Sequence, residues 1–215
     1  MDNRINYHNE AMKIIKTLEG RRPRLLAHVC CGPCSTYPLK FLAEHFEVTV
    51  IYHNSNIYPK AEYERRYQVL HDFLGKFERD FGHKIAVIKT KYDNDDFNAA
   101  LEPFAAAPEG GARCIVCYRK RMQEAMEYAE RERYEYFTTV MTISPHKDSQ
   151  IINKIGQSLA KAYPDVRYFH SDFKKSGGFE EAGKMCEKYC LYRQVYCGCR
   201  YSYEAMLKRP PTSSK

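Results

Sequence analysis

The chain has 215 residues, a formal net charge of +7 and nine cysteines. This length allows a stable core without covalent staples, and we expect one domain over residues 1–215. No apolar run approaches the ~20 residues needed to span a bilayer, and no signal-peptide pattern opens the sequence. A membrane protein and a secreted disulfide framework are therefore disfavoured. We expect a cytoplasmic protein whose thiols are reduced or bound to metal.

Helical and strand patterns alternate along the chain. Apolar spacing predicts helices around residues 12–18, 36–46, 59–81, 117–133 and 152–159, with Ser35 as the cap of the second helix and Pro38 in its first turn. Short apolar runs predict buried strands at residues 24–29, 48–52, 85–88, 136–141 and 166–169. This alternation indicates an α/β fold, in which a mainly parallel sheet is covered by helices on both faces.

Seven of the cysteines fall into three tight groups. The groups are Cys30, Cys31 and Cys34; Cys114 and Cys117; and Cys197 and Cys199. Thiols grouped in this way are typical of ligands that folding brings together around a soft metal or an iron-sulfur centre. The first group follows a predicted strand, and ligands of open α/β sheets bind beyond the carboxyl ends of strands. We therefore predict one polynuclear site at that edge of the sheet.

Two kinds of metal centre remain open for these thiols. A structural zinc ion takes four ligands in a tetrahedron, which is fewer than seven, and we do not expect the adjacent Cys30 and Cys31 to share one small ion without strain. A 4Fe-4S cluster takes up to four thiolates and leaves three for a second metal or for redox chemistry. The pattern favours iron-sulfur, with zinc as the alternative.

The two remaining cysteines are interpreted differently. Cys186 and Cys190 have the i, i+4 spacing of one helix face, so they could be ligands. Buried cysteine acting as a small apolar residue is the commoner explanation, and we favour a structural role for both.

Three further residues are candidates for roles at the predicted edge. Asp93 follows the third strand and is the leading candidate for a carboxylate ligand of a second metal, although it could instead cap the next helix together with Asp95. His146 lies in a predicted loop and is a candidate proton donor. His28 lies inside an apolar strand and is interpreted as a hydrogen-bonded core residue.

In its cysteine groups and the residues around them, the chain resembles the QueH-type epoxyqueuosine reductases. The resemblance rests on residues 28–34, 113–118, 138–139 with 144–147, and 192–199, which occur in this order over nearly the whole chain. It implies reductive removal of the epoxide oxygen of epoxyqueuosine in tRNA, which gives queuosine in the last step of that modification pathway. It further implies a 4Fe-4S cluster and a neighbouring single metal ion, expected to be iron, held by cysteine and a carboxylate.

The same resemblance implies a fold similar to that of the adenine nucleotide α-hydrolases. In those ATP-handling enzymes a phosphate-binding loop is expected after the first strand. Here Cys30 to Cys34 occupy that place, which argues against ATP chemistry.

The chemistry implied by the resemblance needs a cofactor. Conversion of an epoxide to an alkene and water consumes two electrons and two protons, and ordinary side chains do not supply such electrons. An iron-sulfur centre fed by an electron donor, which the sequence does not identify, would provide them, while an iron ion can act as a Lewis acid. Protons would come from Tyr, His or Lys side chains.

The positive charge fits a tRNA anticodon loop, whose phosphates and splayed bases attract basic and aromatic side chains. The candidate tRNA-binding residues flank the second and third cysteine groups: Arg113, Arg119, Lys120, Arg121, Lys174, Lys175, Arg193 and Arg200. The competing interpretation is a solvated helix face with ion pairs to Glu124 and Glu127.

Two other functions stay open at this point. One is a tRNA sulfurtransferase related to the ATP-handling enzymes, which would use the cysteines as persulfide carriers or cluster ligands. The other is a non-enzymatic RNA-binding module stabilised by zinc.

Overall fold

A sheet of five parallel strands forms the centre of the computed structural model, which describes residues 4–209. The strands are β1 (Arg24–His28), β2 (Glu47–Tyr52), β3 (Ala86–Lys89), β4 (Tyr136–Thr139) and β5 (Arg167–Tyr168). Their spatial order is β3-β2-β1-β4-β5, and every neighbouring pair is parallel. The predicted α/β fold is confirmed. The strand order switches at β1, so the crevice beyond the ends of β1 and β4 is where such sheets bind ligands.

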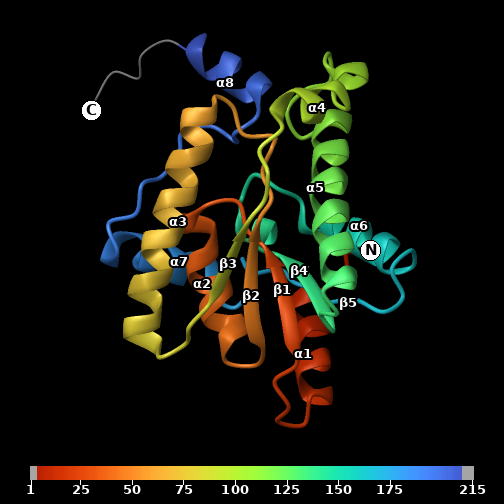
Figure 1. Cartoon of the computed structure of the whole chain (residues 1–215), viewed down its shortest axis with the longest axis vertical. Coiled ribbons are helices and arrows are strands. Elements are labelled where there is room, and N and C mark those ends of the chain that lie inside the picture. The colour runs from red at the N-terminus through yellow and green to blue at the C-terminus, as the bar shows by residue number, and fades with distance from the viewer. Residues whose placement is uncertain (1–3, 210–215) are drawn as a thin grey trace.

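Helices cover both faces of the sheet (Figure 1). The helices of the described residues are α1 (Tyr7–Thr17), α2 (Gly32–Ala43), α3 (Lys60–Phe81), α4 (Asn94–Ala99), α5 (Ala112–Arg131), α6 (Ser149–Ala160), α7 (Gly178–Lys188) and α8 (Arg200–Leu207). Of these, α4 and α8 lie beyond the carboxyl ends of the strands (Figure 1). Short 3-10 helices lie at Glu102–Phe104 and Val140–Ile143. Among the residues that the structure describes, no helix has both the length and the apolar character to cross a bilayer.

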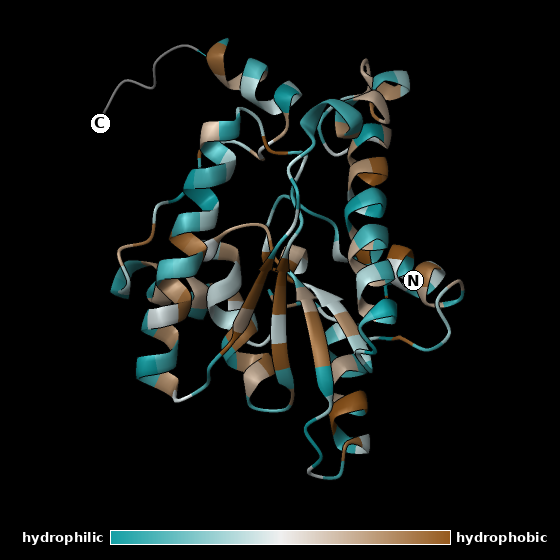
Figure 2. Cartoon of the chain, in the orientation of Figure 1, coloured by the Kyte–Doolittle hydropathy of each residue, from teal (hydrophilic) through white to brown (hydrophobic). Residues whose placement is uncertain are grey.

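Alternate strand residues build two separate cores. Leu25 and Ala27 of β1 pack with α2, α3 and α7, whereas Leu26, between them, packs with α5 and α6. Side chains of successive strand residues point to opposite faces, so an apolar run buries both faces of the sheet at once. Figure 2 shows the brown, apolar strands enclosed by helices whose outer surfaces are largely teal. The carboxyl edge of the sheet is thereby held rigidly from both sides.

Four helices, α1, α2, α5 and α6, begin earlier than predicted, and two of them, α2 and α5, carry cysteines of the three groups. Helix α2 begins at Gly32, so Ser35 lies inside it and donates a hydrogen bond to the Cys31 carbonyl over 2.7 Å instead of capping it. Cys31 is the residue before the helix, and Pro33, not Pro38, occupies the first turn, where its missing N–H costs nothing. Helix α5 begins at Ala112, which places Cys114 and Cys117 in its first two turns.

The structure also revises the two isolated cysteines. Cys186 is buried in α7, as expected for a structural residue, but Cys190 lies beyond the end of that helix with a φ of 50° and is exposed. The prediction that both are buried on one helix face is wrong for Cys190. The prediction of one domain over residues 1–215 stays a prediction, and its two ends lie outside the described residues.

Candidate metal centre

A cavity of about 410 Å³ lies beyond the carboxyl ends of β1 and β4, at the predicted edge of the sheet. Three thiols from two of the three cysteine groups line it, namely Cys30, Cys34 and Cys197. Its walls come from the start of α2, from α5, from the loop after β4 and from the segment before α8. Segments far apart in the sequence therefore meet around one space.

The first cysteine group is tight enough to hold a single ion. The sulfur atoms of Cys30, Cys31 and Cys34 all lie within 4.8 Å of one another, and those of Cys30 and Cys31 are 3.8 Å apart. A tetrahedral ion with metal–sulfur bonds of ~2.3 Å has sulfur–sulfur edges of about 3.8 Å. The sulfur atoms of Cys30 and Cys31 are therefore spaced as two ligands of one small ion would be, contrary to the expectation from the sequence. Cys31 is the residue before α2 and has an extended backbone conformation.

These three thiols share negative charge. Hydrogen bonds from Cys31 and Cys34 hold the pKa of Cys30 well below its ordinary value. The hydrogen bond with Cys30 raises the pKa of Cys31 to about 12, and contacts with Cys30 and Cys31 raise the pKa of Cys34 as well. One thiolate is thus stabilised by two neutral thiols, and a soft cation is the ligand that such a group suits best.

The second and third cysteine groups lie close to each other. Burial and then the charges of Cys197 and Cys199 raise the pKa of Cys114. Burial also raises the pKa of Cys117 to about 12, although the positive charge of Arg121 opposes the shift. The neighbouring Cys197 and Cys199 act in the same direction as burial. No three thiol, imidazole or carboxylate ligand atoms outside the first group lie within 4.8 Å of one another in residues 4–209. The four thiols are therefore neighbours at a wider spacing than the first group.

Arg66 of α3 fixes the segment that carries Cys197 and Cys199. This guanidinium is only 2% exposed, pairs with Glu62 at 2.7 Å, and donates hydrogen bonds to the carbonyls of Cys197 (2.9 Å) and Tyr196 (3.2 Å). Gly198 has a φ of 132°, and a Cβ there would lie 2.9 Å from Arg66 Nη1. Glycine between the two cysteines is thus required by the close approach of the arginine.

Arg66 and three further cations line the cavity, namely Arg121, Lys147 and the exposed Arg209. Arg121 of α5 is 2% exposed, and Lys147 lies half-buried in the loop after β4. Burial lowers the pKa of Lys147, but the neighbouring thiols of Cys197, Cys30 and Cys34 together raise it by more, and the net direction is upward. The one acidic residue among those lining the cavity is Glu109, which is exposed. The cavity therefore combines thiols with buried positive charge.

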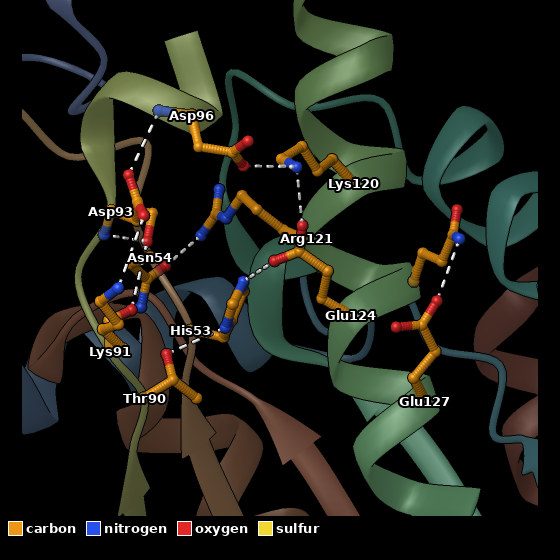
Figure 3. A network of polar contacts seen from close by, with 12 residues as sticks. His53, Asn54, Thr90, Lys91, Asp93, Asp96, Lys120, Arg121, Glu124 and Glu127 are labelled. Atoms are coloured by element: carbon orange, nitrogen blue, oxygen red, sulfur yellow. Dashed lines mark hydrogen bonds and ion pairs between the residues drawn. The ribbon is translucent and has the colours of Figure 1, made fainter. Parts of the chain in front are cut away.

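A polar network holds α5 against the end of β2 (Figure 3). Arg121 donates to the side-chain oxygen of Asn54, and one turn further along, Glu124 contacts His53. Lys120 pairs with Glu124 at 3.0 Å and with Asp96 of α4 at 3.2 Å. The hydrogen bond with His53 and the pair with Lys120 keep the pKa of Glu124 below its usual range although burial opposes this. Helix α5, with its two cysteines, is thereby tied to the strand edge.

Of the three other candidate residues, Asp93, His146 and His28, only His146 lines the cavity. The Asp93 carboxylate accepts a hydrogen bond from the Asp96 N–H and caps α4, its side chain is 50% exposed, and it is absent from the cavity wall. The capping alternative therefore describes its contacts, and its role as a metal ligand gains no support. His146 lines the cavity and is exposed. His28 is fully buried and bonded to Thr139 and the His53 carbonyl, as expected of a core residue.

The predicted tRNA-binding residues divide by exposure. Arg119, Lys175, Arg193 and Arg200 are exposed, and Lys120 and Lys174 are partly buried in ion pairs. Arg113 and Arg121 are buried, and Arg113 donates to the carbonyls of Ala105 and Ala107. Burial removes these two arginines from any surface that RNA phosphates could reach. The predicted ion pair with Glu124 exists for Lys120, whereas Glu127 accepts from Gln123 and Tyr163.

Sequence reasoning missed three residues around the cavity. Arg66 interrupts the apolar face of a helix at core spacing between Tyr63 and Leu70, and a charge at such a position is the signal that could have identified it. Gln194 donates to Cys31 Sγ over 3.3 Å, and Lys147 stands next to His146. Neither of these two carries a pattern that distinguishes it from an ordinary loop residue.

Comparison with known proteins gives a consistent result. The family model described as Epoxyqueuosine reductase QueH matches residues 25–205. A protein of that name from Streptococcus pyogenes serotype M1 is 40% identical over 201 residues, which cover 93% of this chain and 78% of the relative. Another from Staphylococcus epidermidis is 38% identical over 203 residues, covering 93% and 85%. A more distant one from Thermotoga maritima is 28% identical over 184 residues, covering 83% and 89%.

Proposed function

The chain belongs to the epoxyqueuosine reductase QueH family, and from this premise we propose that its thiol-lined cavity is where the epoxide of epoxyqueuosine is reduced. The observation that carries the proposal is the meeting of thiols from the first and third cysteine groups with buried cations in one cavity at the carboxyl edge of the sheet. Family membership selects this oxidoreductase over a tRNA sulfurtransferase and over a zinc-stabilised RNA-binding module.

The reaction sets what the cavity must supply. An epoxide, two electrons and two protons give an alkene and water, so the C–O bonds break and the oxygen leaves fully protonated. Thiols, lysine and tyrosine do not deliver two low-potential electrons, and an iron-sulfur cluster would supply them when bound. The donor set of this cavity suits such a centre because it offers soft thiols and positive charge.

The spacing of the thiols supports a division between two centres. The first group, Cys30, Cys31 and Cys34, has the separations of a tetrahedral single-ion site with its fourth position free, as catalytic metal sites require. The wider set of Cys114, Cys117, Cys197 and Cys199 provides the four thiolates that a 4Fe-4S cluster takes. We propose that the first group holds a single iron and the second set holds the cluster. Three thiols suffice for the first site without Asp93.

His146 is the proposed proton donor. It is exposed and lines the cavity, so a nucleotide that enters would pass beside it. A donor in that position can protonate the departing oxygen and be reprotonated from solvent. Tyr118 also lines the cavity, but burial raises its pKa strongly, which makes it a slower source of protons.

One experiment tests the metal and the reaction together. Protein purified and reconstituted without oxygen is expected to contain at least the four irons of one cluster with matching sulfide. Incubated with a reductant and tRNA that contains epoxyqueuosine, it should yield queuosine, detected by mass spectrometry as the loss of one oxygen atom. Stoichiometric zinc without sulfide would refute the cluster. Turnover of a different modified base, with none of this one, would refute the substrate.

Binding of tRNA is proposed to use the four exposed members of the predicted basic set, which are Arg119, Lys175, Arg193 and Arg200. We expect Arg119→Gln to weaken binding of the anticodon stem-loop. The plot of log K against log[salt], which falls with salt, should become less steep by about 1, because one phosphate contact is lost. Arg131→Gln is the control on the far end of the same helix, with the same change of charge. Fluorescence anisotropy over a range of salt concentrations measures both. An unchanged slope for Arg119→Gln would place the RNA surface elsewhere.

A further inference from the structure

Residues 4–209 contain three buried arginines, Arg66, Arg113 and Arg121, which differ in their hydrogen-bond partners. Arg66 has a carboxylate and two carbonyl partners, and Arg113 clamps two carbonyls of the preceding loop. The only oxygen partner of Arg121 in the described chain is Asn54 Oδ1 at 2.5 Å, and its Nε, like that of Arg113, has no hydrogen-bond partner. Arg66 and Arg113 are thus explained by backbone support, whereas Arg121 is not.

Lys147 is in a similar position. Its ammonium group lines the cavity, and its only hydrogen bond among the described residues is a long one of 3.5 Å to Ser144 Oγ. The titratable groups that act most strongly on Lys147 and Arg121 are thiols and, for Lys147, also the Tyr118 hydroxyl, and none is a carboxylate: Cys117, Cys30 and Cys197 for Arg121, and Cys197, Cys30 and Cys34 for Lys147. Both cations therefore face members of the first group and of the wider set.

Arg121 is buried and Lys147 half-buried. A cation removed from water without a paired anion is unfavourable, so this arrangement needs negative charge inside the cavity. Thiolates bound to metal carry that charge permanently. Resting on the proposed function, we propose that Arg121 and Lys147 are the counter-charge of the metal–thiolate centre and that they favour its reduced state. Both are positioning residues, since they act on the centre through their charge.

Reduction of the proposed iron-sulfur centre would take one electron from an external reductant. No bond would be made or broken, and the charge of the centre would become more negative by one. A nearby positive charge stabilises the more negative state, and the effect is large where water is excluded. Removal of either cation should therefore make the centre harder to reduce.

Asn54 explains how the guanidinium is kept in place. Its side chain is fully buried, its Nδ2 donates to the Val29 carbonyl over 2.8 Å, and its oxygen accepts from Arg121. Figure 3 shows Arg121 directed from α5 toward Asn54, with the contact of Glu124 and His53 one turn along the same helix. One side of the guanidinium is thereby fixed by the strand edge, which leaves the rest of it to face the thiols.

The test is a redox titration of the loaded, full-length protein with dithionite and mediators, followed by electron paramagnetic resonance. Arg121→Gln and Lys147→Gln are each expected to shift the reduction equilibrium about tenfold toward the oxidised form, which for one electron is about 59 mV. Arg121→Lys and Lys147→Arg keep the charge and should recover most of the wild-type potential. Arg131→Gln, an exposed arginine at the far end of α5, should leave the potential unchanged.

The outcomes separate this inference from the proposed function. Wild-type protein without iron and sulfide would refute the cluster itself. Glutamine variants that load normally and keep the wild-type potential would overturn the counter-charge role. If a glutamine variant fails to load while its charge-conserving partner loads, the charge is required and the inference holds. If both variants at both positions lose the cluster, side-chain shape and not charge is what matters, and the inference fails.

Discussion

Alanine at Cys31, Cys117 or Cys199 is expected to remove most of the bound iron and nearly all reductase activity. Each variant deletes a ligand from a different cysteine group, and metal affinity is coupled to folding at such sites. The loss should exceed the roughly 10–100-fold that removal of an outer-shell partner causes, because a direct ligand is absent. Iron and sulfide analysis, the visible spectrum and turnover of epoxyqueuosine in tRNA measure the effect.

The matched controls are Cys186 and Cys190, the two cysteines outside the three groups. Cys186→Ala removes a buried sulfur from α7 and should cost about 1 kcal/mol of stability, as a methyl-sized void does. Cys190→Ala changes an exposed side chain and should be nearly silent. Both should keep wild-type iron content. Equal losses at all five positions would contradict the division into ligands and structural cysteines.

Arg66→Ala should lower iron content although it removes no thiol. The substitution leaves the carboxylate of Glu62 buried without its partner and releases the carbonyls of Tyr196 and Cys197. Breaking a buried ion pair from one side costs about 3–5 kcal/mol, so we expect a large fall in the free energy of unfolding. Denaturation with urea and metal analysis of the same preparation measure the two effects.

A suitable control for Arg66 is Arg79→Ala, which changes an exposed arginine near the other end of α3. It should leave both the stability and the iron content close to wild type, because surface substitutions usually act within ±0.5 kcal/mol. Wild-type iron in Arg66→Ala would show that the segment from Tyr192 to Cys199 keeps its position without the arginine.

The sheet was predictable because its signal is local. Each buried strand is a short apolar run, and the predicted strands overlap β1 to β5, with ends that differ by no more than two residues. The edge that carries the cysteines followed from the direction of parallel strands. The starts of α2 and α5 were missed because glycine, proline and cysteine hide the apolar spacing of a helix. Helices α4 and α8 are short, with six and eight residues, and show too few turns for a clear period. Helix α7 has 11 residues and an amphipathic pattern, which the sequence analysis missed.

The roles of the basic residues were harder to predict for a physical reason. A buried arginine needs hydrogen-bond partners inside the protein, and here those partners are remote in sequence. Asn54 is 67 positions from Arg121, and Cys197 is 131 positions from Arg66. No local pattern encodes such a pairing. A basic residue next to a cysteine was therefore interpreted as a phosphate contact when, for Arg121, its side chain lies inside the protein.

The attachment of Cys197 and Cys199 by Arg66 has a consequence for how the protein is made. All strands of the sheet are complete by Tyr168, so a growing chain can fold its sheet before these two thiols leave the ribosome. Until then the five earlier thiols form an unfinished site. The last two of the proposed ligands reach the site only when the segment after α7 docks on α3. Incorporation of metal would therefore report that synthesis has passed Cys199, and chains interrupted earlier would not acquire the finished centre.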